Sequence, residues 1–229
     1  MNINTTYTKI ITGEDLMETA QHGSTLYPFQ FYYEDLSVFD FNCIEWHWHT
    51  ELEFIYIESG TVTLWIGEDQ FHLTEGNGIF INTKVLHRLY SPSKALIPNF
   101  VFMPSFIAPC DSLIYQKYIL PIISSSLPFL VFHKKVCWQA KVLSIMRQII
   151  SAQDSVLSKE LLTSSLLQNL WLEIFENTDI SYQEEHKDHS TASQARLQLM
   201  MQFIHLNYSR NISLDDIAEQ AMVSKSTTL

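Results

Sequence analysis

The sequence predicts an α+β fold, with a β-rich N-terminal part followed by helices. Residues 1–108 carry short aromatic and β-branched runs broken by Gly, Asn and Pro, a pattern typical of antiparallel strands. Residues 109–177 carry apolar side chains at helical spacing instead. The last eighteen residues, 212–229, follow the pattern of a helix, a tight turn and the beginning of a second helix. These three observations define the fold class and divide the chain.

Five runs within residues 1–108 are predicted to be strands: Phe29–Tyr33, Glu53–Ile57, Thr61–Ile66, Gly78–Ile81 and Asn99–Phe102. The segments Glu58–Gly60 and Gly67–Gln70 combine Gly with polar residues, so we expect hairpin turns there. Many short strands at close intervals favour a small barrel or a sandwich.

Residues 109–177 are predicted to form an antiparallel pair of helices with a break at Ser151–Asp154. The apolar face of the first helix comprises Trp138, Val142, Ile145 and Ile149, and that of the second comprises Leu167, Leu170, Trp171 and Ile174. The second helix is apolar on more than one side, so neighbouring surfaces must cover it. The second helix is expected either to cover the β-rich part or to form the interface of a homodimer. We prefer the homodimer.

The C-terminal part is predicted to be a linker, residues 178–191, followed by helices over residues 192–229. The linker is polar and has no helical period. Ser213 is a good N-cap, and Asp216 suits the positive end of the helix that follows. After a short turn, Ser224 can cap a second helix. The small polar side chains there suit DNA phosphates and base edges, and the candidate DNA-binding residues are Ser224, Lys225, Ser226, Thr227 and Thr228.

Charge and composition exclude several classes of protein. The formal net charge is −11, so the bulk of the chain is unsuited to nucleic acid. From Ala192 onward three basic residues balance three acidic ones, so the excess acid lies in residues 1–191. The N-terminus has no basic region before an apolar run, and no apolar stretch is long enough to span a membrane. We therefore expect a cytoplasmic protein with no membrane partner.

The cysteines support the same location. Cys43, Cys110 and Cys137 are odd in number and far apart in the sequence. We expect reduced, buried thiols rather than disulfides.

His47, His49, Glu53 and His87 form the strongest candidate site in the β-rich part. On a strand, residues 47 and 49 point to the same side, and Glu53 can join them after a slight kink. Imidazole and carboxylate groups are ligands for iron, manganese, nickel or zinc. The same groups can hold a small effector, or form a hydrogen-bonded network inside the fold. The remaining histidines show no such grouping, and we expect them to be surface or satisfied residues: His22, His72, His133, His186, His189 and His205.

This spacing resembles the cupin fold, a small double-stranded β-barrel. The first cupin motif is matched by His47, His49, Glu53 and Gly60, and the second by Gly76 and His87. The sequence departs from these motifs at four positions. Phe41 replaces the initial Gly of the first motif, Asn82 and Lys84 replace the Pro and Gly of the second, and Ser91 replaces its final Asn.

A cupin-like barrel, a helical hairpin, a linker and a helix-turn-helix together resemble the AraC/XylS family of bacterial transcription regulators. The resemblance covers nearly the whole chain from about His22. It implies an effector-binding and dimerisation domain that controls a DNA-binding domain with two helix-turn-helix units. This sequence carries most of the first unit and none of the second, so we expect it to be truncated.

The resemblance implies a ligand-responsive regulator that binds DNA in its full-length form and is not an enzyme. His47, His49, Glu53 and His87 would then hold a small effector, with no cofactor. The alternative is a cupin metalloenzyme of the dioxygenase or isomerase type, in which the same four residues hold a metal. A third possibility is that the chain dimerises with full-length relatives and interferes with them.

Overall fold

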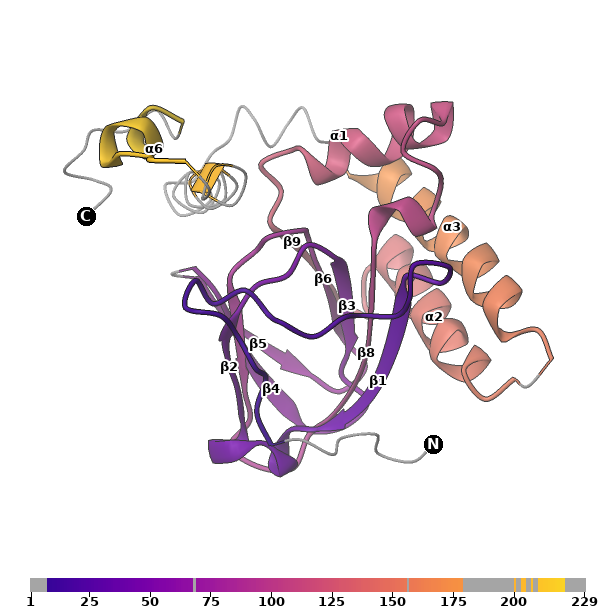
Figure 1. Ribbon diagram of the computed structural model, residues 1–229. Helices are drawn as coiled ribbons and strands as arrows, with labels where there is room; N and C mark the ends of the chain where they lie inside the picture. Colours follow the sequence, from indigo (N-terminus) through magenta and orange to yellow (C-terminus); the bar gives the residue numbers. More distant parts are fainter. Residues whose placement is uncertain are drawn as a thin grey trace.

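The computed structural model describes residues 8–67, 69–155, 157–178, 200, 203–204, 207 and 210–220. Its β-rich part consists of two antiparallel sheets that face each other (Figure 1). The five-stranded sheet has the order β1 (Phe29–Asp35), β8 (Leu96–Phe102), β3 (Leu52–Tyr56), β6 (Gly78–Ile81) and β9 (Phe129–Phe132). The four-stranded sheet has the order β2 (Cys43–His47), β7 (His87–Tyr90), β4 (Thr61–Ile66) and β5 (Asp69–Thr74).

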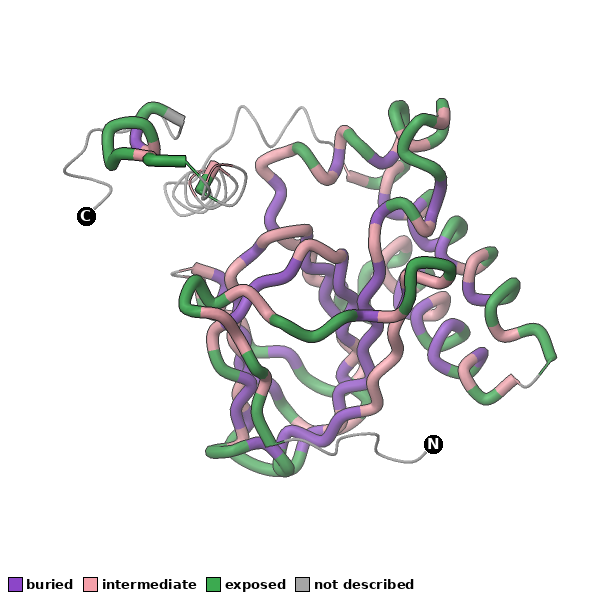
Figure 2. Tube along the Cα trace, viewed as in Figure 1, coloured by how far each residue is buried: buried purple, intermediate pink, exposed green. Residues whose placement is uncertain are grey.

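The predicted antiparallel, cupin-like architecture is therefore confirmed. Among the described strands, no ladder of hydrogen bonds joins the two sheets, so the barrel takes the form of two facing sheets. Apolar side chains from both sheets fill the space between them, among them Ile55, Leu64, Ile79, Leu89 and Ile97. Figure 2 shows buried residues following the strands of both sheets.

Residue alternation along β3 explains how a carboxylate enters this interior. Successive side chains of a strand point to opposite faces. Phe54 belongs to the core beneath the helices, whereas its neighbour Ile55 belongs to the core between the sheets. Glu53 lies on the same side as Ile55 and is only 7% exposed. The strand pattern thus directs Glu53 between the two sheets.

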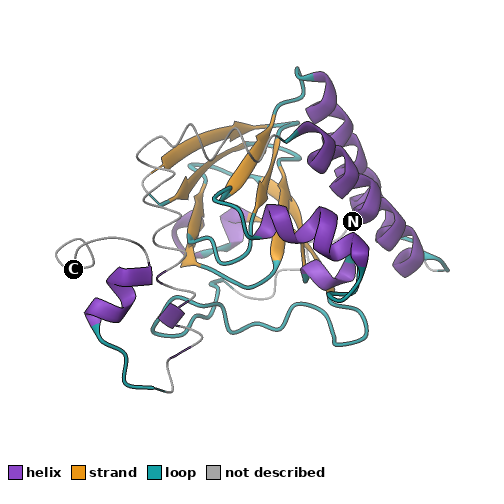
Figure 3. Ribbon diagram, turned by 90° about the horizontal axis from the view of Figure 1, so that it is seen from above, coloured by secondary structure: helices purple, strands orange, loops and turns teal. Residues whose placement is uncertain are grey.

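Helices cover the outer face of the five-stranded sheet. Helix α2 (Cys137–Ala152) and helix α3 (Lys159–Asn177) lie side by side along that face (Figure 3). The buried residues of α3 include the four apolar positions predicted from the sequence. Trp171 packs edge-on against Phe80 of β6, and its indole N–H donates to Tyr118 O at 2.9 Å. Helices α2 and α3 thus share one core with the five-stranded sheet.

Short elements complete the connections. They are the 3₁₀ helices η1 (Leu36–Val38), η2 (Asp40–Asn42) and η3 (Pro104–Phe106), the π-helical turn η4 (Tyr115–Ile119) and the helix α1 (Leu120–Ile123). The last two lead the chain from β8 toward β9. No helix among the described residues is both long enough and apolar enough to cross a membrane.

All five predicted strands are present, but one predicted turn has a different role. Glu58–Gly60 was expected to close a hairpin, yet β3 and β4 belong to different sheets. The segment carries the chain from one sheet to the other and pairs with β8 through Ser59 and Leu96. Gly60 has φ +87°, and a Cβ there would lie 2.7 Å from Lys94 O. Only glycine fits such a close corner without strain.

Strand β9 was not predicted, because it lies in the part expected to be helical. Its four residues pair with β6, from Gly78 with Phe132 to Ile81 with Phe129. The five-stranded sheet therefore extends beyond residue 108, the expected end of the β-rich part. The amide of Asn82 donates to Ile122 O at 3.1 Å and to Leu127 O at 2.9 Å, which fixes the approach to β9. This contact gives a structural role to one departure from the cupin motif.

The C-terminal part is described only in pieces. Helix α6 (Leu214–Gln220) begins where Ser213 was predicted to cap it. The Ser213 backbone N–H donates to Asp216 Oδ2 at 2.8 Å, and the Asp216 N–H donates to Ser213 Oγ at 3.2 Å. This reciprocal pair is a capping box and confirms the predicted helix start. The candidate DNA-binding residues Ser224, Lys225, Ser226, Thr227 and Thr228 lie outside the described residues, as does most of the predicted linker.

The three cysteines are free thiols, as expected. Cys43 is buried, but Cys110 and Cys137 are exposed, so the expectation of burial was wrong for these two. Cys137 is the first residue of α2, and Cys110 lies in the turn between η3 and η4.

Candidate functional site

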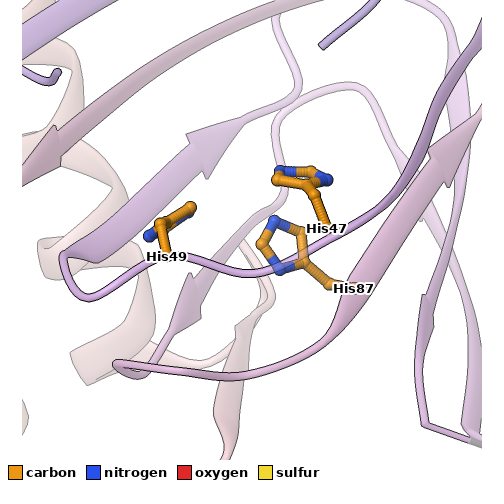
Figure 4. Close-up of side chains that lie close together, drawn as sticks. All are labelled: His47, His49 and His87. Carbon is orange, nitrogen blue, oxygen red and sulfur yellow. The ribbon is translucent and has the colours of Figure 1, made fainter. Parts of the chain in front are cut away.

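The structure brings the four predicted site residues together between the two sheets. Figure 4 shows the imidazoles of His47, His49 and His87 converging. One nitrogen of each of these rings lies within 4.8 Å of the others. Glu53 Oε2 lies 3.4 Å from His49 Nε2 and 3.1 Å from His87 Nε2. All four residues are buried, and His87 is completely inaccessible.

Strand register explains this convergence. His47 is the last residue of β2 and is the antiparallel partner of His87, the first residue of β7. Their ring centroids are 4.1 Å apart. His49 follows two residues later, where the chain turns toward β3 and the inward-facing Glu53. Residues separated by 40 positions in the sequence are therefore neighbours at one end of the sandwich.

Backbone carbonyls fix the protonation pattern of all three imidazoles. Nδ1 of His47 lies 2.8 Å from Glu45 O, and Nδ1 of His87 lies 2.9 Å from Val85 O. Nδ1 of His49 lies 3.2 Å from Glu51 O. A carbonyl oxygen only accepts hydrogen bonds, so each Nδ1 must carry the proton and donate it. In the neutral ring this leaves the lone pair on Nε2, the atom available to a ligand.

The carboxylate of Glu53 controls the charge of the cluster. Burial raises the pKa of Glu53, but His49 and His87 outweigh burial and hold that pKa well below its usual value. Burial and then the neighbouring His87 and His49 hold the pKa of His47 well below its usual value. Burial also lowers the pKa of His49, but its contact with Glu53 raises that pKa overall. The cluster thus contains an ionised carboxylate beside imidazoles of different basicity.

One nitrogen in the cluster depends on Glu53 alone. His87 Nε2 lies 3.1 Å from Glu53 Oε2, in a geometry that does not meet that of a good hydrogen bond. A buried polar atom without a partner costs about 1–3 kcal/mol. In functional sites, such an atom is commonly completed by a ligand.

An N-terminal segment, residues 8–22, adds groups that the sequence did not reveal. His22, which was expected to lie outside the ligand grouping, is not among the three histidines at ligand spacing, but its ring lies 5.6 Å from that of His49. Its Nε2 lies 3.3 Å from Glu18, and its Nδ1 lies 2.9 Å from the hydroxyl of Tyr32. Burial and then the carboxylates of Glu18 and Glu34 raise the pKa of Tyr32. No motif joins these residues, because the fold alone brings the segment to the cluster.

The N-terminal segment is attached to the residue between two cluster histidines. The Trp48 backbone N–H donates to Leu16 O at 3.1 Å, and the Glu18 N–H donates to Trp48 O at 2.9 Å. The Trp48 indole N–H donates to Asp15 O at 2.8 Å. Trp48 is 1% exposed, so its side chain is buried beneath the N-terminal segment that it binds. A movement of His47 or His49 would therefore displace the N-terminal segment.

The cavity between the cluster and the N-terminal segment is small. Its volume is about 20 Å³, with Glu18, His22, Tyr32, His47, His49 and Glu53 among the residues that line it. Holding a single water molecule requires roughly 10–15 Å³ on the same measure. The site in this conformation therefore accommodates an ion or a very small molecule.

At two positions where this sequence lacks a glycine of the cupin motifs, the backbone is strained. Lys84 has φ +61° and Phe41 has φ +58°, both in the left-handed region. The Lys84 backbone N–H donates to His49 O at 2.7 Å, so the strained loop is connected to the cluster. The sequence lacks glycine at both positions, but the backbone keeps the conformation that glycine favours.

Replacing Lys84 with glycine is expected to raise the free energy of unfolding by about 1 kcal/mol, because glycine adopts this φ without steric cost. Lys84→Ala is the matched control, since alanine loses the same side chain but keeps the strain. Urea denaturation measures both. A stabilisation by alanine equal to that by glycine would contradict the role assigned to the backbone.

Comparisons with known proteins agree with this architecture. The sequence profile of the AraC-like ligand binding domain matches residues 30–171. The chain is 25% identical over 221 residues to the "Uncharacterized HTH-type transcriptional regulator YdeC" of Bacillus subtilis (strain 168). That match covers 94% of this chain and 74% of YdeC.

Two solved structures are also similar. ToxT from Vibrio cholerae O395 has a TM-score of 0.48 and 13% identity, over 88% of this chain and 72% of ToxT. An RmlC-like cupin from Shewanella frigidimarina NCIMB 400 has a TM-score of 0.30 and 17% identity, over 33% of this chain and 67% of that one.

The family profile spans β1 to α3 and includes His47, His49, Glu53 and His87. It matches well over half of the chain. The two sheets, the helices that cover one of them and the buried site thus coincide with one family of domains. The chain belongs to the AraC family of regulators through its AraC-like ligand-binding domain.

Proposed function

We propose that the chain is a ligand-responsive transcription regulator whose ligand binds at His47, His49, Glu53 and His87. Ligand binding changes how the C-terminal part, residues 192–229, engages DNA. The predicted DNA contacts are Ser224 to Thr228. A ligand shifts such an equilibrium only if it binds one conformation better than the other.

The observation that carries the proposal is the convergence of four buried ligand-type groups, His47, His49, Glu53 and His87. The contact of His87 Nε2 with Glu53 falls short of good hydrogen-bond geometry, which favours a ligand over a purely structural network. The attachment of the N-terminal segment at Trp48, between His47 and His49, supports a response that extends beyond the cavity.

A homodimer is part of the proposal. Helix α3 leaves three leucines accessible: Leu161 is 77% exposed, Leu172 is 50% exposed and Leu162 is 41% exposed. Apolar side chains repeated along one helix favour contact with a second protein surface. Paired DNA half-sites make a second copy of the chain the natural partner.

The alternative function, a metalloenzyme, would use the same four residues. An enzyme of that type must also hold an organic substrate beside the metal, and ligand pockets for such molecules measure roughly 300–1,000 Å³. The cavity of about 20 Å³ admits neither such a substrate nor an organic effector of that size in this conformation. The regulator is the better supported function because residues 30–171 match the AraC-like ligand binding domain.

The proposal is tested by deleting the gene in its host and complementing it with variants. Transcripts that change on deletion should return with the wild type and with His133→Ala, which alters an exposed histidine. With His47→Ala or His87→Ala, at least some of these transcripts should stay at one constant level. Circular dichroism melting identifies variants that fail to fold.

The proposal is wrong if deletion leaves every transcript unchanged. The site assignment is wrong if folded His47→Ala and His87→Ala proteins both regulate as the wild type does.

A further inference from the structure

We propose that a groove between helix α3 and the π-helical turn η4 binds an uncharged aromatic organic molecule. The groove is lined on one side by Ile107, Ile114 and Tyr118 and on the other by residues of α3 between Gln168 and Phe175. It is separate from the histidine cluster, since none of the described residues that line the groove also lines the cavity between the sheets. The inference therefore adds a second ligand site to the proposed function.

The size of the groove is that of a small-molecule site. Pockets for organic ligands measure roughly 300–1,000 Å³. The groove has a volume of about 340 Å³, whereas the cavity between the sheets has only about 20 Å³. A protein helix is about 10–12 Å across and rises about 5.4 Å per turn, so a single turn fills roughly 400–600 Å³. The groove therefore suits a small molecule better than a helix of a second chain.

The groove combines a buried base with an accessible apolar rim. At the base, Trp171 is 3% exposed and Ile107 is 5% exposed, whereas Ile114 and Leu172 at the rim are 55% and 50% exposed. An apolar ligand that covers the rim removes this apolar surface from water, which is favourable. Leu172 also belongs to the surface assigned above to the homodimer, so the ligand would lie beside that contact.

Two aromatic rings form one corner of the groove. The rings of Tyr118 and Phe175 meet edge to face, with centroids 5.1 Å apart and an interplanar angle of 82°. The Trp171 indole N–H donates to Tyr118 O at 2.9 Å, which holds η4 against α3. Aromatic rings prefer edge-on or offset contacts with further rings. The corner therefore favours an aromatic ligand.

The lining of the groove favours an uncharged ligand. None of the described residues that line it is Asp, Glu, Lys or Arg. The ammonium of Lys117 lies 5.0 Å from the centre of the Tyr118 ring but does not line the groove. A charged ligand would lose hydration without gaining an opposite charge. The amide oxygens of Gln168 and Asn169 can instead accept a hydrogen bond from an N–H or O–H of the ligand.

The backbone of η4 also points to a binding role. Tyr115–Ile119 form a π-helical turn, a conformation found in well under 1% of residues. Such turns recur at functional sites. This turn supplies Tyr118 to the groove, so an uncommon backbone lies where the ligand would bind.

Binding of N-phenyl-1-naphthylamine to the full chain tests the proposal. This dye is uncharged and aromatic, carries one N–H, and fluoresces more strongly in apolar surroundings. The wild type should bind one dye per chain. Leu172→Glu and Ile114→Glu place a carboxylate at the rim, and each should raise the Kd at least about 10-fold. Leu157→Glu is the matched control, because Leu157 is 97% exposed just before α3 and does not line the groove; its Kd should match the wild type.

Hydrogen exchange locates the bound dye. Saturating dye should slow amide exchange in residues 115–119 of the wild type and of Leu157→Glu, but not of Leu172→Glu. Circular dichroism melting confirms that the rim variants fold, as expected for half-exposed positions.

Three results would overturn the proposal. The first is an absence of saturable dye binding to the wild type, and the second is an equal Kd in the folded rim variants. The third is dye binding that leaves exchange in residues 115–119 unchanged. If a second copy of the chain filled the groove instead, light scattering would show a dimer that excludes the dye and that both rim variants convert to monomer.

Discussion

Replacing Phe54 with alanine is expected to lower the free energy of unfolding by about 3–5 kcal/mol. Phe54 is completely buried at the centre of an aromatic cluster on the outer face of the five-stranded sheet. Its ring centroid lies 5.0 Å from that of Phe80, 5.3 Å from Phe100 and 6.5 Å from Phe132. Removal of the ring leaves a cavity between the sheet and the helices. The surrounding side chains are closely packed, so they can fill that cavity only in part.

Phe41→Ala is the matched control for this prediction, because Phe41 is 91% exposed. Its effect should stay within about 0.5 kcal/mol. Urea denaturation followed by circular dichroism measures both variants. A loss below 1 kcal/mol for Phe54→Ala would mean that the helices and the sheet do not share the core described above.

The second large effect is expected at Asn82. Asn82→Ala should lower the free energy of unfolding by about 2–4 kcal/mol, because each buried polar group left unpaired costs about 1–3 kcal/mol. The Asn82 amide donates to Ile122 O and Leu127 O, and its side-chain oxygen accepts from the Thr83 N–H at 2.8 Å. The substitution removes all three bonds from a residue that is 2% exposed.

Asn169→Ala provides the comparison for Asn82. Asn169 lies on the exposed side of α3, where alanine is the better helix former, so this variant should be neutral or slightly stabilising. Thermal unfolding should therefore separate the two variants by several degrees. Equal melting temperatures would show that the connection to β9 does not depend on Asn82.

Much of the fold was predictable because its strands have the composition of strands and its helices have a clear period. The aromatic and β-branched run at Glu53–Ile57 and the helical faces containing Val142 and Leu170 can be recognised directly in the sequence. Strand β9 was missed because Phe129–Phe132 is short, uniformly apolar and flanked by helical segments. A run of that length does not distinguish a buried strand from a piece of helix.

The candidate site was predictable only in its central part. His47, His49 and Glu53 are close in sequence, and His87 falls at the spacing of the second cupin motif. Glu18, His22 and Tyr32 were not predictable, because long-range packing of the N-terminal segment brings them to the cavity. The strain at Lys84 was also hidden, since lysine gives no sequence signal of a left-handed backbone.

The central claim is that the cluster of His47, His49, Glu53 and His87 holds a ligand in the cell. Native mass spectrometry of the chain isolated from its host under gentle conditions tests this directly. We predict a bound mass on the wild type and on His133→Ala that is missing from folded His87→Ala. Identical spectra for the wild type and His87→Ala would contradict the account.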